Sequence, residues 1–434
     1  MSRPVDEPRP VAAGPAGRPA PPDELSAAPD EFPGTIRRAF PNNDGVSVLA
    51  ASAIDDPELR SGIRNLLRKP ELRAELERVW ATPPDADCPH PERVYRELGE
   101  RGWLAPHWPR RYGGLAASAY ATAVTAEELA LHGVPDSVRV NTIDNAGATL
   151  LAAGSEEQRQ RFCPGMAAGE IVFSVLYTEP HAGSDLGSMA TTAEPAGDGW
   201  RLAGTKTWNA RTAQAHFGVC AARVRGHGDN AYAATGLFVV PLDHPGVRVE
   251  PIATVNPERF FTVRLDDVVL PADALVGAPG QGWSLLSEAL GMERTGVCFA
   301  GRARRWFDQL VAALHARGQL EEAERVHRLG ALDAEIRSCR LLAWRAVQGL
   351  AEGRLNGAAA AAAKWWTSEL AQRVAWLAFD LLGPAVHSDR HFPDLVLAAR
   401  EAPGLTLAAG TSEIQLTTLA TDLLDGGDPW EEPT

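Results

Sequence analysis

One stretch near the middle of the chain, residues 172–215, most constrains the fold that this sequence can adopt. Its first part, 172–177, is β-branched and aromatic and predicts a strand. The polar run at 178–185 then ends the strand with a proline and a glycine, and Gly183 would let the backbone approach a bound group closely. Glycine turns separate the next short runs of strand character, which are 191–194, 200–202 and 206–209. The stretch therefore predicts a meander of short strands with a loop suited to binding.

Helical periodicity lies on both sides of this β-rich stretch. From about Pro57 to Gly169, apolar residues recur at helical spacing, beginning with Leu59 and Ile63. Further strands are expected at 216–224, 232–241, 246–253 and 260–269. The helical pattern then returns, with helices expected at 283–316, 321–353, 357–382 and 411–424. This order of helices, strands and helices predicts a multi-domain α+β fold.

The shifts in pattern also give expected domain boundaries. Residues 46–169 form an N-terminal helical domain, 170–276 a middle β domain and 277–434 a C-terminal helical bundle. Residues 1–45 are rich in proline, alanine, glycine and acids, and such a segment cannot bury enough apolar surface to offset the entropy of ordering it. We expect a disordered tail there, with a docking arm for a partner as the open alternative.

Composition and charge exclude several classes of protein. The chain has 434 residues and a formal net charge of −14, so no basic excess exists to neutralise the phosphates of a nucleic acid. No apolar run approaches the roughly 20 residues that a membrane helix needs, and no apolar leader follows Met1. The 5 cysteines form no CxxC pattern, and no metal-ligand spacing occurs. We expect a cytoplasmic protein that has no disulfide framework and binds no metal, nucleic acid or membrane.

Four motifs in order then identify a family. The run TEPHAGSD at 178–185, followed by GTKTWN at 204–209, resembles the flavin-binding middle domain of the acyl-CoA dehydrogenases. Residues 410–415, GTSEIQ, resemble the motif near that family's C-terminus, and the segments 102–114 and 154–170 resemble parts of its N-terminal helical domain. The resemblance implies an N-terminal α-helical domain, a small β-barrel-like middle domain and a C-terminal four-helix bundle. It also implies FAD between the last two parts, and a homodimer or homotetramer.

A flavin needs hydrogen bonds around its ring edge and a side chain over one face. Thr178 and Ser184 have hydroxyl groups that could form these hydrogen bonds, and the Trp208 side chain could cover one face of the ring. By resemblance, the cofactor-binding residues are the following: Val175, Tyr177, Thr178, Gly183, Ser184, Trp208, Asn209, Ala210, Thr411 and Glu413. Family members commonly carry serine or threonine where this chain has Ala210, so only the backbone of that residue could serve. His181 either contacts the cofactor or substrate, or faces solvent.

The residue before Gly410 departs from the family pattern. Many family members have a glutamate there, which removes the proton α to the thioester carbonyl while hydride leaves the β carbon for the flavin. This chain has Ala409, whose methyl group cannot accept a proton. By resemblance, its backbone N–H could still bind the thioester carbonyl of the substrate and stabilise the negative charge that develops there.

Glu293 is the candidate for the missing base. In a continuous helix over 283–316 it falls on the apolar stripe, and no cation lies three or four residues away. A carboxylate in an apolar setting should have a raised pKa, which suits a base that works near neutral pH. Some family members resemble this chain in placing their catalytic glutamate on that helix, just before an arginine, here Arg294. Arg294 and Ser184 would then bind the substrate, and a buried structural carboxylate paired with a distant arginine is the open alternative.

The resemblance implies an FAD-dependent acyl-thioester dehydrogenase that introduces an α,β double bond, an oxidoreductase acting on CH–CH groups. Coenzyme A or a carrier protein would carry the acyl group, and electron-transfer flavoprotein or another acceptor would take the electrons. Two departures leave other functions open. The family's inter-subunit Arg-x-x-Phe-Gly motif is replaced at 315–319, and 382–384 lacks the usual glycine-rich adenosine-binding turn. The alternatives are a flavin-dependent oxidase or monooxygenase, and a non-catalytic subunit of a heteromeric dehydrogenase.

Overall fold

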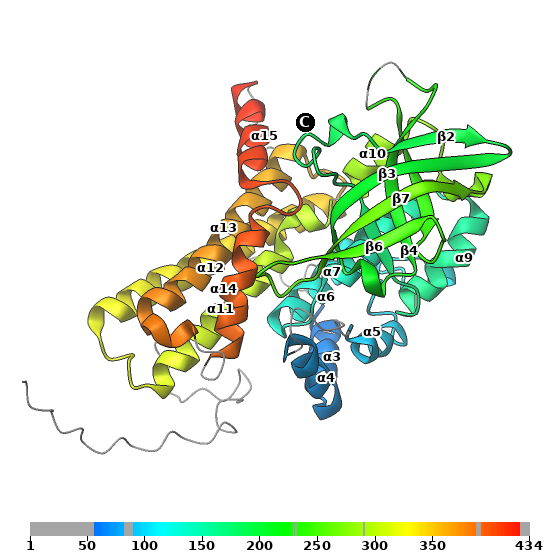
Figure 1. The fold of residues 1–434 in the computed structure, drawn as a ribbon. Coiled ribbons are helices and arrows are strands. Elements are labelled where there is room, and N and C mark those ends of the chain that lie inside the picture. The colour runs from blue at the N-terminus through cyan, green and yellow to red at the C-terminus, as the bar shows by residue number, and fades with distance from the viewer. Residues whose placement is uncertain are drawn as a thin grey trace, which may run out of the picture. The chain divides into compact units, whose positions relative to one another are not determined.

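The computed structural model describes residues 56–81, 90–228, 230, 232–289, 291–387 and 392–425. These residues belong to one compact unit, Ser47–Thr434, and the tail expected at 1–45 lies outside the described residues. Helices, a β-sheet and helices again follow one another along the chain, as the colours of Figure 1 show. The predicted α+β class with helical outer parts and a β-rich middle is therefore confirmed.

The N-terminal part consists of short helices around an apolar core. They are α3 (Pro57–Leu67), α4 (Pro70–Ala81), α5 (Glu92–Gly99), α6 (Ala119–Leu131), α7 (Ser137–Arg139), α8 (Ala148–Ala153) and α9 (Glu156–Ala167). Side-chain caps start two of them, because Asp56 accepts the Leu59 N–H and Ser155 exchanges hydrogen bonds with Gln158. A π-helix, η4 (Val140–Gly147), joins α7 to α8, and π-helical turns occur frequently at functional sites.

The middle part is one mixed, mostly antiparallel sheet. Its strands in the described residues are β1 (Phe173–Leu176), β2 (Thr192–Ala196), β3 (Gly199–Ala210), β4 (Phe217–Val224), β5 (Thr235–Pro241), β6 (Val247–Ile252), β7 (Phe260–Leu270) and β8 (Leu275–Val276). The strand order is β6-β7-β3-β2-β4-β5-β8, and β1 pairs in parallel with β4. Phe173 and Tyr177 pack into the helical core, whereas Leu176 packs into the core of the sheet. The chain from β1 to Tyr177 therefore carries the 178–185 loop to the boundary between helices and sheet.

One sequence expectation in the sheet is wrong. The runs 200–202 and 206–209 were expected as separate strands, but both belong to β3, which is bent by register shifts against β7 on either side of Gly204. A Cβ at Gly204 would lie 2.3 Å from Thr191 Oγ1, so a side chain would separate β3 from the segment before β2. Gly204 therefore lets the long strand β3 bend beside its neighbour, and the strand continues past the glycine.

The C-terminal part returns to helices. They are α10 (Gly282–Ala289), α11 (Val297–Ala316), α12 (Ala323–Ala351), α13 (Gly357–Leu382), α14 (Pro393–Leu405) and α15 (Ser412–Leu424). Helix α13 packs against α11, α12, α14 and α15, and Figure 1 shows α11 to α14 running alongside one another. The alanines at the start of α13 are buried, and their small side chains let the neighbouring helices approach closely. Within the described ranges, every helix is too short or too polar to cross a membrane.

One expectation for this part is also wrong. The helix expected at 283–316 is broken, because α10 ends at Ala289 and α11 begins only at Val297. Gly296 causes part of the break, since it adopts a left-handed φ of 75° and a Cβ there would lie 2.3 Å from Thr367 Oγ1. Helix α14 lies in a segment for which no element was predicted; it begins with Pro393, and proline is well tolerated at the first helical position.

Candidate functional site

The polar loop after β1 is held against β3 by a buried ion pair. Lys206 is fully buried, and its Nζ donates to Tyr177 O at 3.0 Å and to Glu179 Oε1 at 2.7 Å. The Glu179 carboxylate also accepts from Ala190 N at 2.6 Å and from Thr191 N at 2.9 Å. Burial opposes ionisation of Glu179, but Lys206 and these hydrogen bonds hold the pKa of the carboxyl below its usual value. The sequence analysis missed this pair, because its members lie 27 residues apart.

The predicted flavin residues of this loop meet those of β3. Thr207 N donates to Thr178 O at 2.9 Å. Trp208 is therefore next to a residue whose backbone is hydrogen-bonded to the loop. The Trp208 side chain is 54% exposed, unusual for an indole, and its backbone adopts a left-handed φ of 58°. A Cβ at Gly183 would meet no atom within 4 Å, so the loop has open space beside it. An exposed indole beside an open polar loop fits a flat aromatic ring such as a flavin.

Other predicted cofactor residues have different surroundings. Asn209 is buried, and its Nδ2 donates to Phe261 O at 3.0 Å, so this side chain is engaged by the sheet. Ala210 O accepts from Asn141 Nδ2 at 3.2 Å, which ties the end of β3 to the π-helix. Ser184 and His181 are exposed on the loop, and Val175 is half-buried. Thr411 caps α15 by accepting from Ile414 N at 3.3 Å, and Glu413 is exposed in the same first turn.

Glu293 does not lie on a continuous apolar helix, which corrects the sequence expectation. It begins a short 3-10 turn, η8 (Glu293–Thr295), in the break between α10 and α11. Its side chain is half-buried, and in the described part of the chain its carboxylate makes no hydrogen bond or ion pair. The pKa of Glu293 is raised as expected, but the cause is burial of the turn within the fold and not a position on the apolar face of one helix.

Burial raises the pKa of Glu293 to about 7. The charges of Asp136 and Asp144 raise it further, while Lys364 and Arg294 lower it. Burial is the main cause of the raised pKa of the Tyr177 phenol. The charge of Glu293 raises this pKa further, although its effect is smaller than those of Thr149 and Cys220. Tyr177 therefore connects the charge of Glu293 to the 178–185 loop, since it immediately precedes Thr178.

The turn before α15 contains Ala409, whose backbone N–H was expected to bind the substrate. Ala409 and Gly410 adopt left-handed φ values of 55° and 90°. Gln415 Nε2 donates to Ala409 O at 2.8 Å, and Lys364 Nζ donates to Gly410 O at 2.9 Å. Lys364 therefore contacts this turn while its charge acts on Glu293. In the described residues the backbone N–H of Ala409 donates no hydrogen bond, so it is free to bind a carbonyl.

Arg294 lies beside Glu293 in the same turn. Its Nε is buried and has no hydrogen-bond partner among the described residues. Burial lowers the pKa of the guanidinium, although Glu293 opposes this effect. A buried donor without a partner is costly, and a polar group on a bound molecule could satisfy it.

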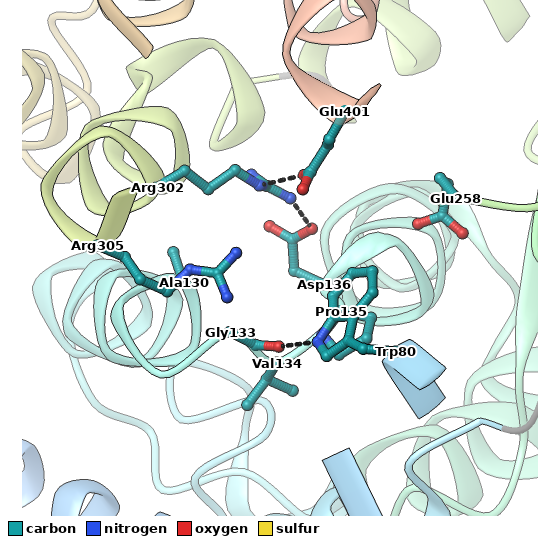
Figure 2. Close-up of a pocket in the computed structure, with 10 residues that line it drawn as sticks. All are labelled: Trp80, Ala130, Gly133, Val134, Pro135, Asp136, Glu258, Arg302, Arg305 and Glu401. Carbon is teal, nitrogen blue, oxygen red and sulfur yellow. Dashed lines mark hydrogen bonds and ion pairs between the residues drawn. The ribbon is translucent and has the colours of Figure 1, made fainter. Parts of the chain in front are cut away.

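A second charged cluster lies where the N-terminal and C-terminal helices meet. Arg302 contacts Asp136 at 2.5 Å and Glu401 at 2.8 Å, and Figure 2 shows its guanidinium between the two carboxylates. The pocket around them has a volume of about 330 Å³, including the part open to solvent. Its lining residues are Trp80, Ala130, Gly133, Val134, Pro135, Asp136, Glu258, Arg302, Arg305 and Glu401. Because Asp136 also acts on Glu293, this cluster contributes to the electrostatics of the site without containing its acid.

Comparison with known proteins decides the family. Three family models match the chain in order: the acyl-CoA dehydrogenase N-terminal domain over 58–170, the middle domain over 174–268 and the C-terminal domain over 280–424. The acyl-CoA dehydrogenase FadE26 of Mycobacterium tuberculosis (strain ATCC 25618 / H37Rv) is 30% identical over 383 residues, which cover 80% of this chain and 94% of that protein. The chain belongs to the acyl-CoA dehydrogenase family. It is an acyl-thioester dehydrogenase, a flavoprotein oxidoreductase acting on CH–CH groups with FAD as its cofactor.

Solved structures agree with this assignment. The crystal structure of acyl-CoA dehydrogenase from Geobacillus kaustophilus has a TM-score of 0.77 and 26% identity, and the match covers 86% of this chain and 99% of that one. The structure described as the Tcur3481-Tcur3483 steroid ACAD has a TM-score of 0.75 and 29% identity, and the match covers 85% and 96% of the two chains. Among the described residues, no three His, Cys, Asp or Glu side chains are placed to hold a metal ion.

Proposed function

We propose that this acyl-CoA dehydrogenase introduces an α,β double bond into an acyl thioester with Glu293 as the general base. The observation that carries the proposal is the combination of an unpaired, half-buried acid with a pKa of about 7 and a methyl group at Ala409. A base is most effective when its pKa lies near the working pH. Glu293 also interacts electrostatically with Tyr177, which directly precedes the 178–185 loop, and with Lys364, which contacts the turn at Gly410.

The reaction requires that two hydrogens leave adjacent carbons of the acyl chain. FAD, when bound, supplies the acceptor for the hydrogen and electron pair that leave the β carbon. The Glu293 carboxylate takes the α proton, and the electron pair of that C–H bond becomes the second bond between the α and β carbons. The backbone N–H of Ala409 donates to the thioester carbonyl oxygen and stabilises the negative charge that develops on it. Thr178, Ser184 and Trp208 would orient the flavin.

The expected substrate is an acyl group carried by coenzyme A or by a carrier protein. Arg294, with its unpartnered Nε, would bind a polar part of that carrier. Electron-transfer flavoprotein or another acceptor would reoxidise the flavin, and the chain would assemble as a homodimer or homotetramer. A cytoplasmic location likewise stays a prediction.

The test compares Glu293→Gln with a matched change on the neighbouring helix. Glu288 is exposed on α10, so Glu288→Gln removes the same charge without entering the site. Purified protein should be yellow and should bleach without oxygen when it receives a suitable acyl thioester. Glu293→Gln should keep the yellow colour and lose bleaching, while Glu288→Gln should behave as the wild type. Normal bleaching by Glu293→Gln would exclude this acid as the base.

A second candidate is a subunit that acts only in a heteromeric dehydrogenase. The observation that favours it is the short connection between Ala316 and Ala323, where the sequence carries no Arg-x-x-Phe-Gly motif. The name of the Tcur3481-Tcur3483 relative also gives two components. A colourless homogeneous protein that binds FAD only with a second chain would favour this function. Hydrogen peroxide formed in step with the oxidised product would instead favour an oxidase.

A further inference from the structure

The chain has three lysines, and one of them, Lys364, lies fully buried on α13 next to the proposed site. Buried lysines are rare, because an ammonium group loses its hydration when it leaves water. The Lys364 Nζ donates to Gly410 O at 2.9 Å and lies 5.8 Å from the centre of the Phe299 ring. These contacts compensate only part of that loss, so the charge at this position needs an explanation beyond packing.

The first part of the explanation is the turn that Lys364 contacts. Ala409 has a left-handed φ of 55°, a conformation that a residue with a side chain adopts only at an energetic cost. Two donors keep the turn in this conformation: Gln415 Nε2, at 2.8 Å from Ala409 O, and Lys364 Nζ at Gly410 O. Because both carbonyls are held from the side of α13 and α15, the backbone around the Ala409 N–H has a fixed orientation.

The second part is the charge of Lys364. Five titratable groups from five parts of the chain act on or respond to the Glu293 carboxylate: Asp136 before α7, Asp144 on η4, Tyr177 after β1, Arg294 on η8 and Lys364 on α13. Asp136 and Asp144 oppose ionisation of Glu293, and only the two cations favour it. Lys364 is the one cation among them that also contacts the Ala409–Gly410 turn. Glu369 and Glu413 are the other acids whose charge acts on Lys364.

We propose that Lys364 is a positioning residue that serves both halves of the proton-abstraction step: its contact with Gly410 fixes the turn whose N–H binds the thioester carbonyl, and its positive charge favours the carboxylate form of Glu293. This inference rests on the proposed function of Glu293 and Ala409. It accounts for a cation that contacts a turn with only a methyl side chain at Ala409, because the charge of Lys364 also acts on the proposed base on η8.

The two roles can be separated by two substitutions. Lys364→Gln removes the charge but keeps a hydrogen-bond donor, whereas Gln415→Met removes one donor from the turn but keeps the charge. The readout is the exchange of the α hydrogen for solvent deuterium in an acyl thioester whose β carbon is replaced by sulfur. This analogue can be deprotonated but cannot form the double bond, so exchange reports proton abstraction without turnover. FAD content and the circular dichroism spectrum verify the fold of each variant.

Loss of the Lys364 charge raises the pKa of Glu293 above about 7, so fewer molecules hold the carboxylate at neutral pH. We expect Lys364→Gln to move the acid side of the exchange profile upward by about one pH unit, with a plateau near the wild-type rate. Gln415→Met should leave the midpoint unchanged and lower the plateau about tenfold. A wild-type midpoint in folded Lys364→Gln would overturn the inference. Undiminished exchange in Glu293→Gln would instead overturn the proposed function.

A measurement that leaves Lys364 in place gives an independent test. With only Lys69, Lys206 and Lys364 in the chain, lysine labelled with carbon-13 gives three signals, and Lys69→Arg assigns the signal of the half-buried Lys69. Burial lowers the pKa of Lys364 to about 8, and the charge of Glu293 opposes this effect. Removing that charge in Glu293→Gln should therefore lower the Lys364 midpoint further, while Glu288→Gln should not change it. An unchanged midpoint in Glu293→Gln would contradict the coupling.

Discussion

In two lysine–glutamate pairs of this molecule, the pKa of the glutamate departs from its usual value in opposite directions. In the flavin loop, Lys206 contacts Glu179 directly at 2.7 Å, and two backbone N–H groups complete the hydrogen bonding of the carboxylate. At the proposed site, Lys364 donates instead to Gly410 O and leaves the Glu293 carboxylate without a direct partner among the described residues. The pKa of Glu179 is accordingly lowered, and that of Glu293 is raised to about 7.

The difference separates a structural charge from a reactive one. A carboxylate whose lone pairs are all engaged stabilises its surroundings and cannot take up a proton at neutral pH. A carboxylate held near a cation but not hydrogen-bonded to it keeps its lone pairs available for a substrate. The predictions below test this division, beginning with the largest expected effect.

The sharpest contrast should come from the same substitution at both acids. Glu293→Gln should lower the rate of α,β-dehydrogenation by about 10³-fold, because general bases contribute roughly 10²–10⁴-fold, and should not lower stability. Glu179→Gln should lower the free energy of unfolding and the FAD content, because it disrupts the buried pair with Lys206. Anaerobic bleaching and urea unfolding measure the two effects. If Glu293→Gln and Glu179→Gln lowered the rate and the free energy of unfolding equally, the distinction between a reactive and a structural carboxylate would fail.

Breaking the structural pair from its other side should destabilise the sheet. Lys206→Met leaves the Glu179 carboxylate buried without its cation, and we expect a loss of about 3–5 kcal/mol in the free energy of unfolding. Arg264→Met is the matched control, because Arg264 and Glu250 form an exposed ion pair at 3.2 Å in the same sheet. Exposed pairs contribute about 0–1 kcal/mol, so the control should unfold near the wild-type urea concentration. Similar values for both variants would contradict a structural role for Lys206.

The turn that places Glu293 can be disturbed without touching the acid. Gly296→Ala puts a Cβ at a φ of 75° and 2.3 Å from Thr367 Oγ1, so η8 must shift. The left-handed conformation alone costs roughly 1–2 kcal/mol, and displacement of Glu293 should also slow bleaching. Gly318→Ala is the control, because its φ is 64° but a Cβ there meets nothing within 4 Å. The control should show a loss of stability alone; equal rates in the two variants would mean that η8 does not position the acid.

The smallest effect should appear in the pH dependence of stability, with opposite signs at the two acids. The folded pKa of Glu293 lies above its usual 4.5, so stability falls as pH rises from 4.5 towards 7, and Glu293→Gln should remove that fall. The folded pKa of Glu179 lies below its usual value, so its stabilisation is present at neutral pH and is lost on acidification. Melting temperatures of the wild type and both variants from about pH 2.5 to about pH 8 measure these slopes, because the Glu179 slope lies below its usual pKa of 4.5. Parallel slopes would contradict the assigned directions.

Local signals explain what the sequence could predict. The strand before Thr178, the proline–glycine loop and the strand containing Trp208 follow from residue type and short spacing, so the flavin loop was found with its partner strand. The α+β class followed from changes in periodicity along the chain. The missing carboxylate at Ala409 was also visible, because a methyl group excludes proton transfer whatever the fold.

The errors have tertiary causes. The apolar pattern over 283–316 is continuous, and only the contact between Gly296 and Thr367 on another helix shows why the helix breaks there. The Lys206–Glu179 pair joins residues far apart in the sequence, so no local spacing indicates it. Lys364 follows a run of alanines, and its role depends on Gly410, 46 residues away. Sequence reasoning thus selected Glu293 as the candidate base but could not predict that Asp136, Asp144 and Lys364 act on its charge.

The most direct test of the central claim is the rate of anaerobic bleaching by an acyl thioester, measured from pH 5 to pH 9 in the wild type and in Glu293→Gln. The account predicts that the wild-type rate rises with pH to a plateau, with a midpoint near 7, and that the FAD-loaded variant does not bleach at any pH in this range. A wild-type midpoint near 4.5, or a bleaching variant, would show that another group removes the proton.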